Sequence, residues 1–205
     1  MGIEEWKQVF KPYIGHHSIA IYPVVLRPYS RGWIRLSSYD AYDSPIIEPN
    51  IFGDDRDLDI LVEGMKYALR VAQTPPFQRY NAQPFQTKFP GCEEMPIYSE
   101  EYLRCQALTY TSITWHPAGT VKMGAVSDPT AVVDPQLRVK GVKGLRVVDA
   151  SVMPTVISGN LNAPTVMIAE KIADLMKGRQ LLPFLPPMSP AMISRLPYLR
   201  YNVFR

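Results

Sequence analysis

The segment Trp115-His116-Pro117 holds the histidine with the most suggestive chemical context in the chain. His116 follows a β-branched stretch and precedes Pro117 and Gly119, a pattern that predicts a sharp turn at the end of a strand. An imidazole titrates near neutral pH and can accept a proton from an alcohol, so His116 is a candidate general base. A packed, hydrogen-bonded structural histidine is the alternative interpretation.

Two amides and a proline precede the apolar run that follows Pro164. Asparagine is a favoured helix cap and proline suits the first helical turn, so Asn160, Asn162 and Pro164 have a plain structural explanation. One amide suffices as a cap. A second amide, together with the positive end of the helix dipole, can stabilise partial negative charge on a ligand. Asn160 and Asn162 are therefore candidate ligand-binding residues.

Asp149 follows a short apolar stretch that resembles a buried strand. Proteins of the α/β class place ligands at the carboxyl ends of such strands, which makes Asp149 a further candidate. A turn residue is an equally good explanation.

Other kinds of chemistry lack their sequence signatures. The chain contains no G-x-S-x-G hydrolase elbow, no G-x-x-x-x-G-K-[ST] phosphate loop and no G-x-G-x-x-G dinucleotide fingerprint. It has three histidines, two of them adjacent at His16 and His17, and no zinc-binding spacing. The sequence therefore predicts no metal site.

Three helices that position these candidates are predicted from apolar spacing and capping residues. The clearest begins at Asp54 or Asp55 and ends before Pro75. A shorter helix runs from about Glu100 to Leu108, and a third runs from Pro164 to Met176. The apolar stripe of the first helix comprises Leu58, Leu61, Val62, Met65, Ala68, Leu69 and Ala72.

Short strands complete the predicted secondary structure. Ser18–Leu26 and Trp33–Ser38 have strand composition and are predicted to form a hairpin or an adjacent pair. Residues 40–53, interrupted by prolines and a glycine, are predicted to form a loop. Leu137–Val139 and Leu145–Val148 are two further strand-like pieces, separated by a turn. The sequence thus predicts a globular protein with both helices and strands.

Composition excludes several classes of protein. The chain has 205 residues and a net charge of +3, with no basic stripe typical of a nucleic-acid binder. No segment has the pattern of a signal peptide or a transmembrane helix.

The proline-rich end, residues 180–205, is predicted to be an extended or disordered tail, with a weak membrane-surface or partner contact as the alternative.

Cys92 and Cys105 are the two cysteines of the chain. An even number at short spacing permits a disulfide, but two free thiols in a reducing compartment would give the same sequence. The residues alone leave the choice open.

Long blocks of the chain resemble the C-terminal portion of the glucose-methanol-choline (GMC) oxidoreductases. They are "LRPYSRGWIRL", "QTPPFQRY", "WHPAGTVKMG" and "VVDPQLRVKGVKGLRVVDASVMPTVISGNLNAPTVMIAEKIADLM". Within this family, the blocks are similar to those of insect FAD-dependent glucose dehydrogenase-like proteins. The resemblance implies an α+β fold with a mostly antiparallel substrate-domain sheet, residues 1–125. Residues 126–179 are then a return segment that completes an FAD-binding α/β domain and the active site.

The same resemblance implies roles for individual residues. His116 corresponds to a general base or hydrogen-bond partner of the substrate hydroxyl, and Asn160 corresponds to its partner across the substrate. An alcohol or sugar is then oxidised by hydride transfer to flavin N5. The residues implied to contact FAD are Trp115, Asp149, Ala150, Asn160, Leu161 and Asn162.

One departure from the family pattern is large. The N-terminal half, with its G-x-G-x-x-G cradle for the ADP part of FAD, is absent from this sequence. Two hypotheses follow: the chain is a fragment that needs the missing half for activity, or it is an inactive remnant with a binding or regulatory role. By family analogy we expect export from the cell, and we then expect Cys92 and Cys105 to form a disulfide.

Overall fold

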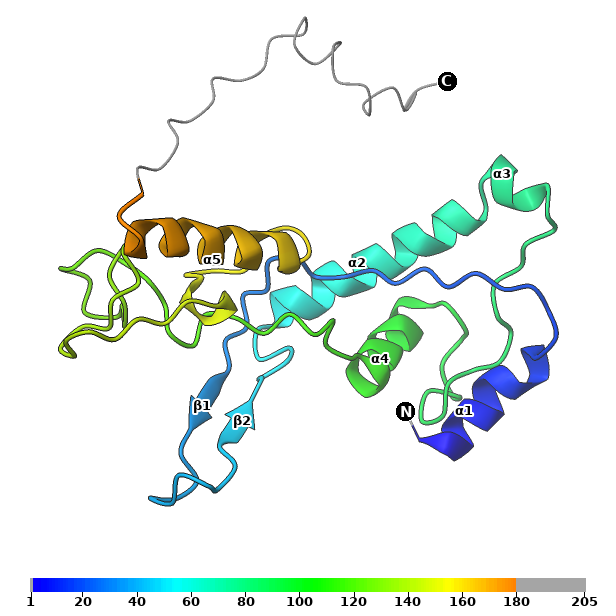
Figure 1. Ribbon diagram of the computed structural model, residues 1–205. Coiled ribbons are helices and arrows are strands. Elements are labelled where there is room, and N and C mark those ends of the chain that lie inside the picture. The colour runs from blue at the N-terminus through cyan, green and yellow to red at the C-terminus, as the bar shows by residue number, and fades with distance from the viewer. Residues whose placement is uncertain (1, 180–205) are drawn as a thin grey trace, which may run out of the picture.

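The computed structural model describes residues 2–179 and combines helices with one small sheet. Figure 1 shows, in chain order, α1 (Ile3–Phe10), β1 (Trp33–Arg35), β2 (Ile46–Glu48), α2 (Asp55–Ala72), α3 (Pro75–Gln78), α4 (Glu100–Tyr110) and α5 (Asn162–Met176), with 3₁₀ helices η1 (Lys11–Tyr13) and η2 (Ala150–Val152). No helix among these residues is both long and apolar enough to cross a membrane. The tail predicted for residues 180–205 lies outside the described part of the chain.

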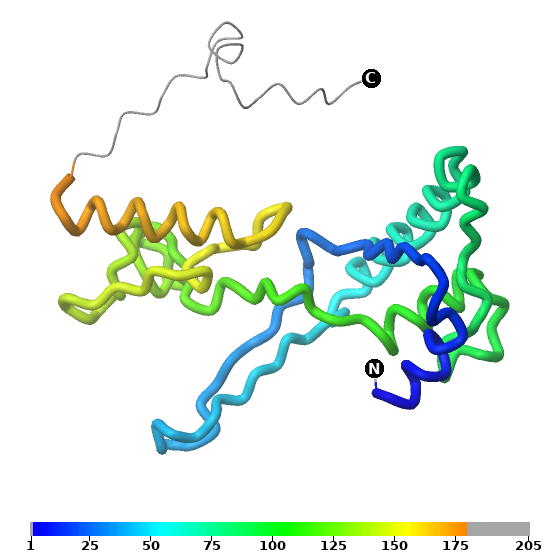
Figure 2. Tube along the Cα trace, turned by 45° about the vertical axis from the view of Figure 1, so that its right-hand side comes forward, coloured from blue at the N-terminus to red at the C-terminus, as the bar shows by residue number. Residues whose placement is uncertain are grey.

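Two hydrophobic clusters divide the structure into a helical lobe around α2 and α4 and a C-terminal lobe around α5. Figures 1 and 2 show the two lobes on opposite sides of the molecule, joined by extended chain. The helical lobe buries Leu58, Val62, Cys92, Tyr102, Leu103 and Ala107. The C-terminal lobe buries Val133, Leu137, Val152, Met153, Leu161, Ile168 and Ile172. Val121 and Met123 pack against the C-terminal cluster, so contacts cross the predicted division at residue 125, which stays a prediction.

The predicted helix before Pro75 is confirmed as α2. The side chain of Asp54 accepts a hydrogen bond from the backbone N–H of Arg56 at 3.1 Å and so caps the helix start. Leu58 and Val62, one turn apart, are buried against α4. Pro75 and Pro76 then begin the separate short helix α3, because a proline cannot continue α2.

Asp57, on the first turn of α2, is a buried carboxylate with three donors. It accepts hydrogen bonds from the backbone N–H groups of Tyr29 and Ser30, both at 2.8 Å, and from the Ser30 hydroxyl. Asp57 is only 3% exposed. Asp57 therefore fastens the turn around residues 28–31 to the start of α2.

The second predicted helix is confirmed as α4, which extends two residues beyond the expected Leu108 to Tyr110. The hydroxyl of Ser99 caps it by accepting from the Tyr102 N–H at 3.2 Å. Cys92 and Cys105 form a disulfide with Cα atoms 5.9 Å apart, which joins the preceding loop to α4.

The predicted hairpin is wrong. Ser18–Leu26 forms no strand, and Trp33–Arg35 pairs instead with Ile46–Glu48, inside the region that we expected to be a loop. The pairing is antiparallel, with Ile34 opposite Ile47. Asp57 holds the intervening turn against α2, and no backbone hydrogen bond joins the segments on the two sides of that turn. In the described residues the expected antiparallel sheet consists of this one pair.

The two strand-like pieces after residue 136 are reduced to isolated bridges. Arg138 pairs with Arg146 in an antiparallel bridge, and the connecting turn contains Gly141 and Gly144 with positive φ angles of 78° and 75°. Glycine is the residue that adopts such angles without steric cost. The turn was predicted, but the paired segments on either side of it are too short to be strands.

The third predicted helix is confirmed as α5, with a corrected start. The helix begins at Asn162, two residues before Pro164, and Leu161 occupies the position before the first helical residue. Pro164 therefore lies in the first turn, where its missing N–H costs no hydrogen bond. Gly178, just after the helix, has a φ of 64°, as expected for a residue that stops a helix.

Candidate active site

His116 and Asn160 lie in direct contact. Nε2 of His116 is 2.8 Å from Oδ1 of Asn160, although the two residues are 44 positions apart in the chain. His116 is half-buried and Asn160 is exposed. A carboxamide has one acceptor and one donor group, so Asn160 can pair with either imidazole tautomer by turning its amide. The pair combines an imidazole, which can donate or accept a proton, with a neutral hydrogen-bonding group.

The backbone around His116 is constrained on both sides. Trp115 has a positive φ of 59°, which is uncommon for a residue with a side chain, and Pro117 restricts His116 to extended conformations. Gly119 has a φ of 89°, and a Cβ atom there would lie 3.2 Å from the carbonyl oxygen of Met153. The turn after His116 therefore passes close to the backbone near Met153, where a larger residue would be strained by the positive φ angle and crowded against that carbonyl.

Backbone hydrogen bonds join the segment after His116 to η2. The N–H of Val121 donates to the carbonyl of Ser151 at 2.9 Å, and the N–H of Met123 donates to the carbonyl of Val152 at 2.9 Å. These bonds place His116 beside the chain that leads to Asn160.

A link from the segment that precedes β1 reaches the same chain. Nε of Arg27 donates to the hydroxyl of Ser158 at 2.6 Å, across 131 positions of sequence. Ser158 stands two residues before Asn160, so this contact helps to hold the loop that carries the amide.

The start of α5 has no side-chain cap, which corrects the capping interpretation of the two asparagines. Oδ1 of Asn160 contacts His116 instead, and Asn162 is the first helical residue. Because Pro164 has no N–H, the donors at this end that lack an intrahelical partner are those of Asn162 and Ala163, together with that of Leu161. The positive end of the helix dipole is therefore available to a ligand.

A hollow of about 300 Å³ lies between the start of α5, η2 and the segment around His116. Its lining residues are Trp115, His116, Pro117, Ala150, Leu161, Asn162 and Thr165. The hollow thus gathers side chains from three separate parts of the sequence.

Most of the residues proposed from the sequence meet at this hollow. Trp115, His116, Ala150, Leu161 and Asn162 line it, and Asn160 adjoins it through its contact with His116. The assigned roles of these residues remain predictions.

Asp149 differs from the other candidates. Its carboxylate accepts from the N–H of Ser151 at 2.7 Å and from the Ser151 hydroxyl, which caps η2. It is not among the lining residues. The side chain therefore acts as the turn-forming group that the sequence allowed, and its contact with a cofactor stays a prediction.

Two lining residues were not singled out from the sequence. Thr165 lies one helical turn after Leu161 and donates its hydroxyl to the Leu161 carbonyl at 2.7 Å. The spacing of four residues on α5 was the available signal. Pro117 had been noted only as a turn residue, and its ring forms part of the wall.

The hollow suits an aromatic ring system with acceptor atoms at its edge. Trp115 and Leu161 supply apolar surface, and the start of α5 supplies N–H groups and a positive dipole end. His116 is the only ionisable side chain in the lining. These groups fit the isoalloxazine end of FAD, whereas the sequence offers no glycine-rich loop for the diphosphate end.

Comparison with known proteins identifies relatives over most of the chain. The family model described as GMC oxidoreductase matches residues 28–169. The glucose dehydrogenase [FAD, quinone] of Drosophila pseudoobscura pseudoobscura is 48% identical over 160 residues, covering 78% of this chain and 26% of that protein. The mitochondrial choline dehydrogenase of Homo sapiens is 42% identical over 160 residues, covering 77% of this chain and 25% of that protein.

A solved structure leads to the same family. A structure of Aspergillus oryzae RIB40 formate oxidase, studied for the effect of a mutation on FAD modification, matches with a TM-score of 0.64 and 30% identity. The match covers 75% of this chain and 26% of that one. The chain spans about a quarter of the length of the curated relatives described above. On the extent of these matches, the chain belongs to the GMC oxidoreductase family.

Proposed function

We propose that this chain supplies the catalytic pair and part of the flavin pocket of an FAD-dependent enzyme that oxidises the CH–OH group of an alcohol or sugar. The contact of 2.8 Å between His116 and Asn160 at the edge of the hollow carries this proposal. It brings an imidazole that can act as a base and an amide that can orient a hydroxyl group to one point. The names of the relatives, which include dehydrogenases and an FAD-containing oxidase, support the reaction class.

In this proposal, His116 and Asn160 manage the substrate hydroxyl. The imidazole accepts the hydroxyl proton through a ring nitrogen that carries a lone pair, and the amide group of Asn160 orients the same oxygen by hydrogen bonding. Bound FAD would supply the hydride acceptor for this chemistry: the alcohol would lose one proton to His116 and one hydride to the cofactor, and would become a carbonyl compound. His116 ends protonated and must release that proton to solvent before the next cycle.

The residues at the start of α5 would hold the ring end of the cofactor. Leu161 and Trp115 would contact its apolar surface, and the N–H of Asn162 would donate toward a carbonyl at its edge. The helix dipole favours negative charge at this place, which makes reduction of a bound flavin easier. Ala150, on η2, would face the chain that leads from the ring toward the phosphates.

Activity in this proposal requires polypeptide that the present chain does not span. The hollow of about 300 Å³ lies at the lower limit of pockets for drug-sized ligands, too small to enclose a dinucleotide. The glycine-rich phosphate cradle is absent from the 205 residues. The partner that completes the enzyme therefore supplies the ADP-binding half, as the resemblance implied. The disulfide in the helical lobe is consistent with the expected export, because disulfides persist in oxidising compartments.

Reconstitution tests the proposal. The chain is combined with the part of the Drosophila pseudoobscura glucose dehydrogenase that it does not match, in the presence of FAD. We expect stoichiometric flavin absorbance in the complex and dye reduction with glucose or a simple alcohol, and neither with the chain alone. A complex that binds no flavin, or that binds flavin but reduces no dye with any alcohol or sugar, would favour the remnant with a binding or regulatory role.

A further inference from the structure

The loop of residues 154–160 carries Asn160 from η2 to the start of α5. Within residues 2–179, this loop makes no backbone–backbone hydrogen bond. Its side chains make two hydrogen bonds there: Asn160 contacts His116, and the hydroxyl of Ser158 accepts from Nε of Arg27 at 2.6 Å. A loop with so few bonds does not by itself fix the direction of a side chain.

Packing restrains this loop mainly at its ends. Met153 and Leu161, which flank it, are buried, and Val156 packs against the same hydrophobic cluster of the C-terminal lobe. Ser158 and Asn160, in contrast, are exposed. The hydrogen bonds of these two residues therefore decide where the second half of the loop lies.

Arg27 starts from a backbone that is fixed to α2. Pro28 restricts the backbone of Arg27 to extended conformations. Immediately after Pro28, the N–H groups of Tyr29 and Ser30 donate to the buried carboxylate of Asp57, both at 2.8 Å. The guanidinium that reaches the loop is thus anchored two residues away from a firm attachment to the helix.

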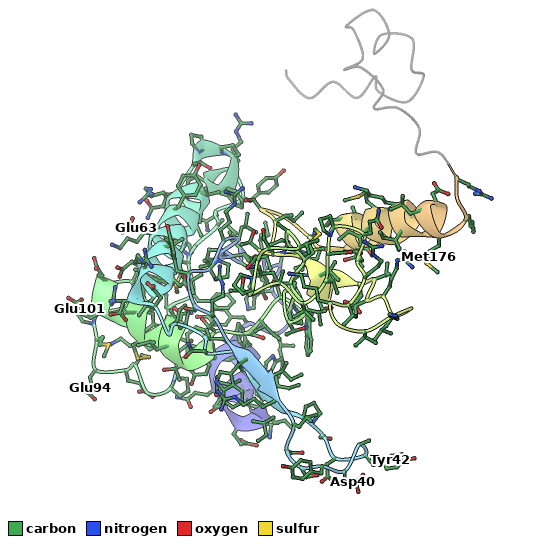
Figure 3. All side chains as sticks on the ribbon, turned by 90° about the vertical axis from the view of Figure 1, so that its left-hand side faces the viewer. Asp40, Tyr42, Glu63, Glu94, Glu101 and Met176 are labelled. Atoms are coloured by element: carbon green, nitrogen blue, oxygen red, sulfur yellow. A yellow bond between two sulfur atoms is a disulfide. The ribbon has the colours of Figure 1, made fainter. Side chains whose placement is uncertain are left out.

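The bond between Arg27 and Ser158 also joins two parts of the chain. Within residues 2–179, no other hydrogen bond or ion pair connects the residues up to 114 with those from 115 onward. In Figures 1 and 2, the chain that leads to β1 passes beside the start of α5. Figure 3 shows Glu63 of α2 and Met176 of α5 on opposite sides of the molecule. The bond therefore connects a segment anchored on α2 to the lobe that contains the hollow.

We propose that Arg27 is a positioning residue: its bond to Ser158 holds the loop of residues 154–160 so that the Asn160 amide stays in contact with His116. The inference rests on the proposed function, because the pair matters for catalysis only if that function is correct. Arg27 makes no hydrogen bond with either member of the pair and acts through Ser158. Misplacement of a catalytic group by about 1 Å can lower a rate about a hundredfold.

Two substitutions of Arg27 separate its hydrogen bond from the rest of the side chain. The amide nitrogen of Arg27→Gln takes the place of Nε, because each is the fourth atom of its side chain, so a neutral donor remains. In Arg27→Met a methyl group takes that place and the donor is lost. Arg79→Met, which changes an exposed arginine after α3, is the matched control.

NMR of the full chain without FAD provides the first test. The side-chain amide signals of Asn160 and the imidazole signals of His116 are compared among the variants. We expect both sets to move toward those of freely hydrated groups in Arg27→Met, and to stay close to the wild type in Arg27→Gln and Arg79→Met. Ser158→Ala, which removes the acceptor, should give the same spectrum at the pair as Arg27→Met.

Turnover of the reconstituted enzyme provides the second test. Arg27→Met should lower kcat about tenfold, with KM changed less than about twofold and the flavin still bound, whereas Arg27→Gln should keep kcat within about threefold of the wild type. In an Asn160→Ala background, Arg27→Met should have no further effect on kcat, because no amide remains to be positioned.

The proposal is overturned if Arg27→Met leaves the signals of the pair unchanged, if Arg27→Gln behaves like Arg27→Met, or if Arg27→Met and Asn160→Ala lower kcat by independent factors. A change in KM alone would assign Arg27 to direct contact with the substrate and would overturn it as well. The expected NMR changes in a chain whose complex binds no FAD would contradict the proposed function and leave the positioning of the amide standing. Wild-type turnover that Arg27→Met does not alter would do the reverse.

Discussion

The helical lobe and the C-terminal lobe satisfy their polar groups in different ways. In the helical lobe, α2 and α4 carry most of the backbone pairing and begin with caps from Asp54 and Ser99. In the C-terminal lobe, irregular chain is held by carboxylates: Asp134, for example, accepts from the N–H groups of Gln136 and Arg138 at 2.8 and 3.0 Å. Among its elements, α5 alone begins without a side-chain cap, and its start faces the hollow.

This difference indicates what each lobe contributes to the candidate site. In the helical lobe, side-chain caps supply acceptors at the starts of α2 and α4. In the C-terminal lobe, the start of α5 has no such cap, and it lies beside His116 and Asn160. Free donors in a partly apolar hollow are where a ligand gains most, because its acceptors replace water without competing protein groups.

The largest effect is expected from His116→Ala in the reconstituted enzyme. Loss of the base should lower kcat by about a hundredfold or more, with the flavin still bound. Dye reduction with glucose or a simple alcohol measures the rate. His17→Ala, which removes an exposed histidine that does not line the hollow, is the matched control and should leave kcat unchanged. Full activity of His116→Ala would remove this residue from the mechanism and, with it, the contrast between the lobes.

The disulfide is expected to stabilise the helical lobe by about 3 kcal/mol, the usual size for a closed loop of this length. Replacing both Cys92 and Cys105 with serine should lower the free energy of unfolding of α2 and α4 by that amount. Amide exchange of α5 in the same sample is the internal control and should change little. An equal loss of protection in α5 would mean that the two lobes unfold as one unit.

A smaller loss is expected from Asp57→Asn. The amide keeps the size of the side chain but replaces one acceptor oxygen by a donor that faces the N–H groups of Tyr29 and Ser30. We expect the free energy of unfolding to fall by about 2 kcal/mol, measured by urea denaturation. Asp59→Asn, which breaks an ion pair on the surface with Arg104, is the control and should cost less than about 1 kcal/mol. Similar losses in both variants would contradict the anchoring role of Asp57.

The same variant should change how stability depends on pH. Burial acts to raise the pKa of Asp57, but hydrogen bonds from Ser30 and Tyr29 outweigh it and hold the pKa below its ordinary value. The stabilisation is therefore complete above about pH 4, the pKa of an unperturbed aspartate, and is lost as the pH falls through the lower pKa of the folded state. The wild-type chain should lose stability over that acid range more steeply than Asp57→Asn. Parallel pH profiles of the two proteins would show that Asp57 is not the group responsible.

Much of the helical structure could be predicted because its signals are local. Three signals each act within a few residues: the apolar stripe of α2, the cap at Ser99 and the proline pair after α2. They predicted the bounds of α2 and α4 closely. The resemblance of the blocks around His116 and Asn160 likewise supplied the candidates for the site. The start of α5 was placed two residues late because asparagine and proline there were read as caps.

Pairing between distant segments could not be predicted in the same way. Trp33–Arg35 and Ser18–Leu26 have similar strand composition, yet only the first found a partner, in Ile46–Glu48. A strand's partner depends on the path of the chain between them, and here that path is held in part by Asp57, which lies outside both segments. Composition describes how well a residue fits a strand, but it does not contain the position of the neighbour.

The sequence by itself determined the periodic helices, the family and the candidate pair at the site. Only the tertiary structure decided that Asn160 turns to His116 instead of capping α5, that Asp149 caps η2, and that Thr165 joins the hollow. The physical reason is that an asparagine or aspartate can bond to its own backbone or to a distant group with similar energy. Which bond forms is decided by the packing that brings the distant group within reach.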